Sequence, residues 1–461
     1  MSDSQVTEPS VSSPKVLKGV IITAIAAVLS FVLYEILPYD TNANKGLAIL
    51  LFVAILWFTE AIHISITALL IPILGVATGL PGLDTKKALS TFADPIIFLF
   101  FGGFALATAL HVQKIDKKIA FWLISMSGSH LGVATLSIFG VTAFLSMWIS
   151  NTATAAMMLP LALGIMSQLD QKQDRNTFVF ILLGIAYSAS IGGLGTMVGS
   201  PPNAIASKAL DLDFAEWMKY GLPMAIVLLP LMLLAMYIVL RPRLNRKIVV
   251  ETVEIPWTIS RVITLAIFII TAIAWICGGW IGSTFGISSP DTWIAIAAAV
   301  AVVLFGSANW KQVSENTDWG VLFLFGGGLT LSAMLKDSGA SLVLGQQVAT
   351  TFIHAHPFIV IVVVTVFIIA LTEFTSNTAS AALLVPVFAS IAAQMGLPKE
   401  VLVLVIGIGA SCAFMLPVAT PPNAIVFGTG LIKQKEMVSV GFILNIFCVV
   451  LISLWAYFFL L

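Results

Sequence analysis

The chain has 461 residues, of which 59% are hydrophobic and 10% are charged, and its formal net charge is zero. A water-soluble domain of this size needs far more charge to cover its surface, so the composition excludes that class. The balanced charge also gives no sign of a nucleic-acid partner. Apolar runs long enough to cross about 30 Å of hydrocarbon recur from Val20 to the C-terminus, and they are uniformly apolar rather than alternating. We therefore expect an all-α polytopic protein in a lipid bilayer.

The N-terminus is a polar segment that leads into the first apolar run. Residues 1–18 are polar and residues 20–37 are apolar. This run is longer than a signal-peptide core and no small-residue cleavage site follows it, so we expect a retained span within an N-terminal unit of residues 1–44. The positive-inside rule places the basic clusters, and with them the N-terminus, in the cytoplasm. The clusters are Lys15 and Lys18; Lys114, Lys117 and Lys118; Lys172 and Arg175; Arg241, Arg243, Arg246 and Lys247; and Lys433 and Lys435.

A polar break at residues 241–252 separates two halves, residues 45–250 and 251–461, which we interpret as repeats. Rare polar and helix-breaking residues recur in both, in the same order, at offsets of 224 (325 − 101), 226 (376 − 150) and 220 (420 − 200). The matched segments are Phe101–Gly103 with Phe325–Gly327, Ser150–Pro160 with Ser376–Pro386, and Ser200–Ile205 with Thr420–Ile425. Such duplication is typical of secondary transporters. The first Phe-Gly-Gly segment is followed by basic residues and the second by few, which predicts inverted topology.

Each Ser-Asn-Thr sequence lies in the middle of an apolar stretch that is too long for one span. The stretches cover residues 131–166 and 357–395. Ser, Asn and Thr are good helix N-caps and tolerate turns, so we expect a re-entrant helical hairpin in each half. Irregular backbone at that depth must be buried in protein or line a cavity. The hairpin tips would be Ser150, Asn151 and Thr152 in one half and Ser376, Asn377 and Thr378 in the other.

The two Pro-Pro sequences predict a second pair of breaks. Proline ends the preceding half-helix, and the residue before it can cap a new half-helix that begins with proline. The breaks fall at Gly199–Pro202 and Ala419–Pro422. Together with the hairpins, four half-helix N-termini would meet near the membrane midplane. Their unpaired N–H groups and partial positive charge suit an anion.

Oxygen atoms around these breaks suit a hard monovalent cation. No Lys or Arg lies within the four motifs, so a dianion would need bound cations to offset its charge. Moving two charges against about 100 mV costs roughly 4.6 kcal/mol, which cation symport would overcome. Sodium is the cation that we expect. The candidate ligands are Ser146, Ser150, Asn151 and the Gly199 carbonyl in the first half, and Thr372, Thr375, Asn377 and the Ala419 carbonyl in the second.

Several acidic residues stand in apolar surroundings, where an ionisable side chain is a candidate for function. Asp94 and Asp318 hold matching places before a helix in each half, and helix capping is the simpler interpretation. Glu60 is interpreted as a structural residue at a membrane edge. Glu373 neighbours Thr372, and the sequence leaves open whether it supports the cation site. The Phe-Gly-Gly glycines are expected to permit close helix packing.

At these residues the sequence resembles the divalent anion/sodium symporter family, specifically the bacterial INDY-type sodium/dicarboxylate transporters. The resemblance covers the chain after residue 15 and rests on both Ser-Asn-Thr motifs, both Pro-Pro-Asn motifs and the Thr59–Ile62 segment. It implies about eleven spanning helices and two re-entrant hairpins. It also implies a homodimer in the bacterial inner membrane.

The resemblance further implies that each Ser-Asn-Thr tip holds one carboxylate of a four-carbon dicarboxylate such as succinate, fumarate or malate. Ser200, Thr420 and Pro421 would line the site, and two sodium sites would match the oxygen ligands above. Transport would be of the elevator type. Alternatives are a sodium-independent dicarboxylate exchanger, a citrate or sulfate transporter of the same fold, and a passive anion channel. An enzyme is the weakest alternative, because the apolar segments hold no nucleophile–base motif.

Overall fold

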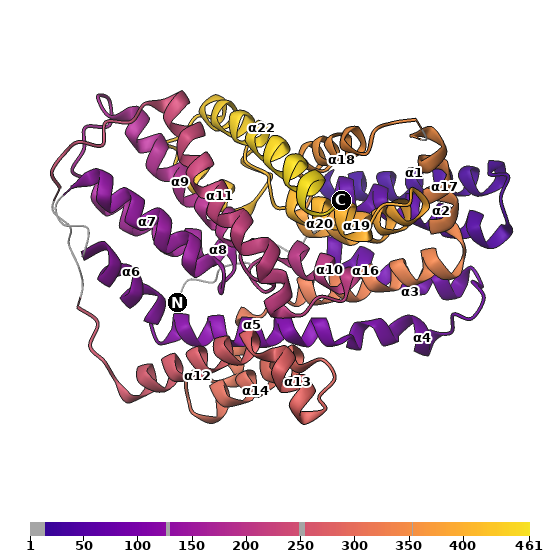
Figure 1. Ribbon diagram of the computed structural model, residues 1–461, viewed down its shortest axis with the longest axis horizontal. Coiled ribbons are helices and arrows are strands. Elements are labelled where there is room, and N and C mark those ends of the chain that lie inside the picture. Colours follow the sequence, from indigo (N-terminus) through magenta and orange to yellow (C-terminus); the bar gives the residue numbers. More distant parts are fainter. Residues whose placement is uncertain (1–13, 126–129, 249–253, 353) are drawn as a thin grey trace.

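The computed structural model describes residues 14–125, 130–248, 254–352 and 354–461, and these residues form an all-helical protein (Figure 1). The helices that precede the polar break are α1 Pro14–Ile36, α2 Thr41–Thr59, α3 Ile64–Ala77, α4 Thr85–Ser90, α5 Pro95–Val112, α6 Ile115–Ser125, α7 Leu131–Ser146, α8 Asn151–Met166, α9 Arg175–Gly192, α10 Pro201–Leu210 and α11 Phe214–Leu240. The helices that follow it are α12 Ile259–Ile276, α13 Gly278–Phe285, α14 Pro290–Leu304, α15 Trp310–Asn316, α16 Trp319–Asp337, α17 Ala340–Thr351, α18 Pro357–Thr372, α19 Asn377–Gln394, α20 Lys399–Gly409, α21 Pro421–Phe427 and α22 Gln434–Phe459.

Many of these helices are suited to a bilayer. Within the described ranges, nine are long and apolar enough to cross a membrane, or ten if the bent pair α13–α14 forms one span. Four further apolar helices are shorter, at 14 to 16 residues: α3, α7, α8 and α18. Large apolar side chains on α1 and α12 are exposed, as a lipid-facing surface requires. The chain is a multi-pass membrane protein, and the expected count of eleven spans stays a prediction.

In both expected hairpins the helix is interrupted at the Ser-Asn-Thr sequence, as predicted. Helix α7 ends at Ser146 and α8 begins at Asn151, and α18 and α19 are interrupted in the same way between Thr372 and Asn377. The Ser150 hydroxyl accepts a hydrogen bond from the Ala153 N–H at 3.3 Å, and the Ser376 hydroxyl accepts one from Ala379 at 3.4 Å. Each serine therefore caps the returning helix of its hairpin.

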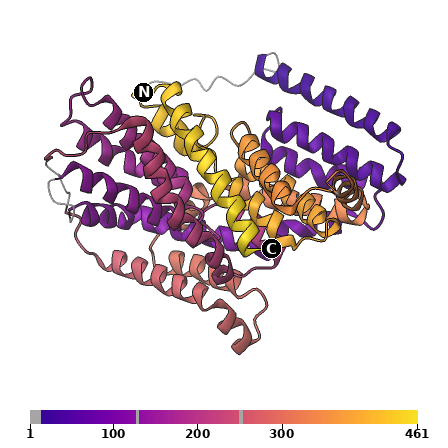
Figure 2. The same cartoon turned by 45° about the horizontal axis from the view of Figure 1, so that its top comes forward.

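The two halves pack against each other in a reciprocal pattern. Helix α5 of the first half lies along α14 of the second, while α16 of the second half lies along α3 of the first. The Phe-Gly-Gly glycines permit both approaches. A Cβ on Gly102 would come within 2.4 Å of the Ala295 carbonyl oxygen, and one on Gly327 within 2.6 Å of the Ala68 carbonyl oxygen. Likewise α10 packs on α19 and α21 packs on α8, so each half contributes helices to the other's hairpin. Helices α12 to α14 lie together at the lower edge of both views (Figures 1 and 2).

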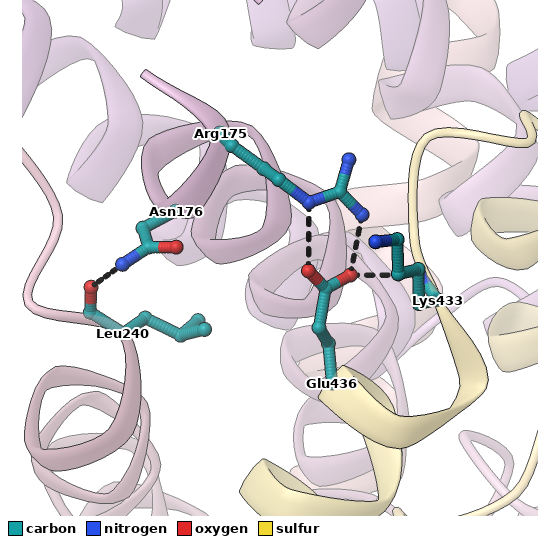
Figure 3. A network of polar contacts seen from close by, with 5 residues as sticks. All are labelled: Arg175, Asn176, Leu240, Lys433 and Glu436. Carbon is teal, nitrogen blue, oxygen red and sulfur yellow. Dashed lines mark hydrogen bonds and ion pairs between the residues drawn. The ribbon is translucent and has the colours of Figure 1, made fainter. Parts of the chain in front are cut away.

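Most of the basic clusters gather at one end of the bundle. The Arg246 guanidinium pairs with Asp174 beside the start of α9, at 2.8 Å. The Lys118 ammonium contacts the Ile255 carbonyl after the polar break. Arg175 forms a bidentate pair with Glu436, with both N–O distances 2.8 Å, and so joins the start of α9 to the start of α22 (Figure 3). This clustering agrees with one cytoplasmic face.

The neighbourhood of the Arg175–Glu436 pair also ties together helix ends from both halves. The Asn176 amide donates to the Leu240 carbonyl at 2.7 Å, which links α9 to the end of α11 (Figure 3). Lys433 is the N-cap residue of α22, and its backbone N–H donates to the Glu436 carboxylate at 2.7 Å. The proposed boundary between repeats, at residues 250 and 251, lies outside the described residues.

Candidate functional site

All four broken segments face one cavity of about 750 Å³. The two hairpin tips and the two Pro-Pro breaks line it together, although they come from four separate stretches of the chain. The predicted residues in its lining are Ser150, Asn151, Thr152, Gly199, Ser200, Thr375, Ser376, Asn377, Thr378, Ala419, Thr420 and Pro421. The volume is large enough for a small organic ligand together with water.

The N-termini of the broken helices carry the positive potential of this cavity. Helices α8 and α19 begin at the tips, and α10 and the short α21 begin at the Pro-Pro breaks. The Thr420 hydroxyl accepts from the Asn423 N–H at 3.3 Å, whereas the Ser200 hydroxyl makes no cap bond and lies 3.3 Å from the Ser411 hydroxyl. Prolines occupy the first two positions of α10 and α21 and have no N–H, so the N–H groups left to favour an anion are those at the starts of α8 and α19.

Within the described part of the chain, no Lys or Arg lines this cavity. Its charged members are Glu60 and Asp318, both acidic. A bound anion would therefore find helix ends, amides and hydroxyls but no basic side chain. The cavity needs positive charge from another source to hold an anion of charge two.

A cluster of oxygen atoms lies behind the first hairpin tip. The buried Ser146 hydroxyl lies 2.6 Å from the Asn151 amide oxygen and 2.7 Å from the Ala189 carbonyl oxygen. The same amide atom lies 3.1 Å from the Ala189 carbonyl and 3.2 Å from the Gly199 carbonyl. A hydroxyl has one proton, so it cannot satisfy this many acceptors. A reversed Asn151 amide or a bound cation would supply the missing positive charge.

The second half repeats this cluster. The buried Thr372 hydroxyl lies 2.6 Å from the Asn377 amide oxygen and 2.7 Å from the Ala410 carbonyl oxygen. Again one proton faces two acceptors. The Thr375 hydroxyl instead donates to the Leu371 carbonyl at 2.9 Å and lies 2.7 Å from the Ser380 hydroxyl. The carbonyls of Ala189 and Ala410 were not predicted, because every residue carries one and only the fold selects which is used.

Two asparagines that sequence reasoning passed over hold the unwound segments in shape. The Asn203 amide donates to the carbonyls of Gly193 and Thr196, at 2.8 and 2.7 Å. The Asn423 amide donates in the same pattern, to Ala413 and Leu416, at 3.2 and 3.0 Å. The Asn of each Pro-Pro-Asn motif therefore closes the loop that precedes it. Its occurrence at the same place in both motifs was the available signal.

The opposite side of the cavity is formed by α2, α5 and α16, which we call the facing wall. It contributes Thr59, Glu60, Phe100, Phe104 and Asp318. Glu60, which the sequence placed near a membrane edge as a structural residue, lines this cavity. Asp94 and Asp318 both cap helices, accepting from Ile96 and Val321 at 3.1 Å, as expected.

A second cavity of about 860 Å³ adjoins the first and shares Ser150 and Thr152 with it. It is lined by Lys117 and Asp116 of α6, the helix that packs beside the other basic segments. Burial raises the pKa of the Asp116 carboxyl, and its hydrogen bond with His111 partly offsets that effect. The second cavity therefore lies between the first hairpin tip and the charged start of α6.

Two halves with reciprocal packing, matched helix breaks and a central polar cavity define a secondary membrane transporter. Residues 14–461 match the family model described as the sodium:sulfate symporter transmembrane region. The chain belongs to this family, the divalent anion/sodium symporters, as its motifs had indicated. Sodium-coupled transport of anions is accordingly the activity class of the protein.

Similar proteins agree with this assignment. The chain is 56% identical over 450 residues to a protein of Haemophilus influenzae described as an uncharacterized transporter, across 96% of this chain and 97% of that one. It is 34% identical over 479 residues to SdcS, a sodium-dependent dicarboxylate transporter of Staphylococcus saprophyticus, across 96% and 91%. The solved structure of the Alcanivorax borkumensis YdaH transporter matches with a TM-score of 0.57 at 15% identity, across 89% of this chain and 98% of that one. That likeness supports the fold alone.

Proposed function

We propose that the protein imports four-carbon dicarboxylates such as succinate, fumarate and malate together with sodium ions. The observation that carries the proposal is the meeting of both Ser-Asn-Thr tips in one cavity whose described lining has no basic side chain. In this proposal Ser150, Asn151 and Thr152 hold one carboxylate. Ser376, Asn377 and Thr378 hold the other. The similarity to a named sodium-dependent dicarboxylate transporter supports the same substrate class.

Sodium ions take the place of basic residues in this proposal. The members of each oxygen cluster are hydroxyls, amides and carbonyls, which are the ligands of a hard monovalent cation. One ion would bind Ser146, Ser150, Asn151 and Gly199, and another would bind Thr372, Thr375, Asn377 and Ala419. Ala189 and Ala410 join these sets through their carbonyls. Asn151 and Asn377 each belong to the substrate-binding residues and also to one of the sodium-binding sets. Sodium and substrate would therefore stabilise each other's binding.

The arrangement of the helices supports an elevator mechanism. We call α7–α11 and α18–α22, which carry the four broken segments, the motif group. The cavity lies between this group and the facing wall, so a sliding motion of one against the other would carry the site across the bilayer. With the basic end in the cytoplasm, the second cavity would open inward and the N-terminus would be cytoplasmic. A homodimer in the bacterial inner membrane would hold the facing wall still.

Uptake by purified protein in proteoliposomes tests this function. We expect radiolabelled succinate to accumulate when sodium is higher outside, and to accumulate little when choline replaces sodium. Equal uptake in both conditions would refute symport, and exchange with internal succinate would then indicate an antiporter. Competition by unlabelled citrate or sulfate stronger than by fumarate or malate would reassign the substrate. Non-saturating uptake would indicate a channel.

A further inference from the structure

The unwound segment of the second half is organised by one buried carboxylate. Glu373, which is 3% exposed, follows Thr372 at the end of α18. Its oxygens accept from the backbone N–H groups of Phe414 at 2.8 Å, Met415 at 3.0 Å and Leu416 at 3.2 Å. The Asn445 amide of α22 donates to it at 2.7 Å. Three successive N–H groups thus point at one carboxylate, which fixes the direction of the segment.

The charge of this carboxylate has no basic partner. Among the described residues, no Lys, Arg or His forms an ion pair with Glu373. Its hydrogen bonds come from uncharged donors, which leave a net negative charge next to the Thr372 cluster. A buried charge of this kind is stabilised when a cation binds nearby.

The first half has no equivalent of this carboxylate. The position that corresponds to Glu373 is Met147 (373 − 226 = 147). There the hydroxyl of Thr196 donates to the Met147 carbonyl, and the Trp217 indole donates to the Leu194 carbonyl at 3.0 Å. The first segment is therefore held by neutral groups of its own half, and the two sites differ although their motifs match.

A tyrosine of the first half holds the other side of the same segment. The fully buried Tyr187 hydroxyl donates to the Phe414 carbonyl at 2.7 Å, and the two rings pack edge to face with centroids 5.1 Å apart. The peptide group between Phe414 and Met415 is thus bound at its carbonyl by Tyr187 and at its N–H by Glu373. We call these contacts the 414–415 clamp.

The clamp joins the two oxygen clusters. Tyr187 lies two residues before Ala189, whose carbonyl belongs to the first cluster. Glu373 follows Thr372 of the second cluster, and the clamped segment begins just after Ala410, whose carbonyl also belongs to that cluster. The Tyr187 hydroxyl therefore passes a displacement of the end of α9 to the second unwound segment, beside the Ser200–Ser411 hydroxyl contact and the packing of α9 on α21.

We infer that Tyr187 and Glu373 are positioning residues that couple the two cation sites through the 414–415 clamp. The inference rests on the proposed sodium sites and specifies how they communicate. A cation at the first site fixes the end of α9, the clamp orders the segment at Ala410, and the second site then binds more tightly. Because coupling is reciprocal, occupation of the second site strengthens the first by the same factor.

The mildest test is Tyr187→Phe, which removes the hydroxyl and keeps the ring. Succinate uptake is measured as a function of sodium concentration in proteoliposomes. We expect the Hill coefficient for sodium to fall toward one and the half-saturating sodium concentration to rise about fivefold, as for one lost hydrogen bond. Uptake at saturating sodium should stay within about twofold of wild type. Tyr220→Phe is the matched control, because the Tyr220 hydroxyl makes no hydrogen bond within the described residues.

Glu373→Gln tests the other side of the clamp. The amide nitrogen of glutamine would face backbone N–H donors, so the half-saturating sodium concentration should rise more than in Tyr187→Phe. In the double variant the two effects should not add, since both residues hold one peptide group. If Glu373→Gln does not fold, the Tyr187→Phe series decides the question by itself.

The outcomes separate the clamp from the proposed function. Wild-type uptake that ignores sodium would refute sodium symport and the coupling with it. Sodium-dependent wild-type uptake with a Hill coefficient of one would refute the coupling alone. A Tyr187→Phe variant with the wild-type Hill coefficient and half-saturation would also refute it, as would an equal change in Tyr220→Phe.

Discussion

One ion pair crosses the boundary between the motif group and the facing wall, and it offers a test of the elevator motion. Lys208 on α10 contacts Asp94 at the start of α5, with Nζ and Oδ2 3.0 Å apart. The two side chains are 37% and 19% exposed, so solvent screens the pair and its contribution is about 0.5–1 kcal/mol. If α10 slides along α5, this pair must break in every cycle. It then favours the observed state by roughly two- to fivefold.

Asp94→Asn removes the charge and keeps the helix cap, because asparagine caps as well as aspartate does. The assay labels a cysteine placed at Ala107, which lines both cavities, with a membrane-impermeant maleimide in inside-out vesicles. The background carries Cys277→Ser, since Cys277 is exposed and the other two cysteines are buried. Without sodium or substrate, we expect the ratio of labelled to protected protein to be roughly two- to fivefold lower in Asp94→Asn than in the same background with Asp94.

Asp337→Asn is the control for this experiment. Asp337 of α16 pairs with Lys87 of α4 at 3.2 Å, and both residues lie on the side of the facing wall. An elevator motion leaves that pair intact, so its loss should not change the labelling ratio. An unchanged ratio in Asp94→Asn, or an equal fall in Asp337→Asn, would show that the Lys208–Asp94 pair does not break during transport.

Three further predictions follow from the packing and the site. Asn151→Ala or Asn377→Ala should abolish succinate uptake while size-exclusion chromatography still shows a folded protein; wild-type rates in both variants would contradict the motif assignment. Gly102→Val should lower the melting temperature and the yield of folded protein, because any Cβ there meets the backbone of α14; an unchanged melting temperature would contradict the close approach. Arg175→Gln, which breaks the half-exposed pair with Glu436, should cost at most about 1 kcal/mol in stability and leave transport nearly intact; a large loss of uptake would show another role.

The breaks in the helices could be predicted because they depend on unusual residues. Serine before a helical stretch and paired prolines have few other interpretations in an apolar segment, and Ser150 and Ser376 cap their helices as expected. Repetition of these signals in both halves made them stronger. The Phe-Gly-Gly glycines were assigned correctly for a similar reason, since close helix packing requires a small residue.

The parts that escaped prediction depend on tertiary contacts. Backbone carbonyls such as those of Ala189 and Ala410 have no sequence signal, and only the fold brings them to a hydroxyl. Glu60 was interpreted as a structural residue, and its place in the cavity follows from α2, whose end it caps within the facing wall. Tyr187 carried no motif, and its contact with Phe414 joins residues 227 positions apart.

The exact span count could not be predicted or confirmed from helix length. Several apolar helices of 14 to 16 residues lie below the usual spanning length, and hairpin arms resemble spans in composition. What sequence supplies here is the pattern of breaks. The packing partners of each arm determine whether it crosses the bilayer.

In the proposed mechanism, sodium ions replace basic side chains in holding a doubly charged substrate. Isothermal titration calorimetry of succinate into purified protein tests this directly. The titration is run once in sodium chloride and once in choline chloride at the same ionic strength. We expect binding in sodium and none in choline, with an affinity that rises as sodium is increased. Succinate binding of equal strength in both salts would contradict it.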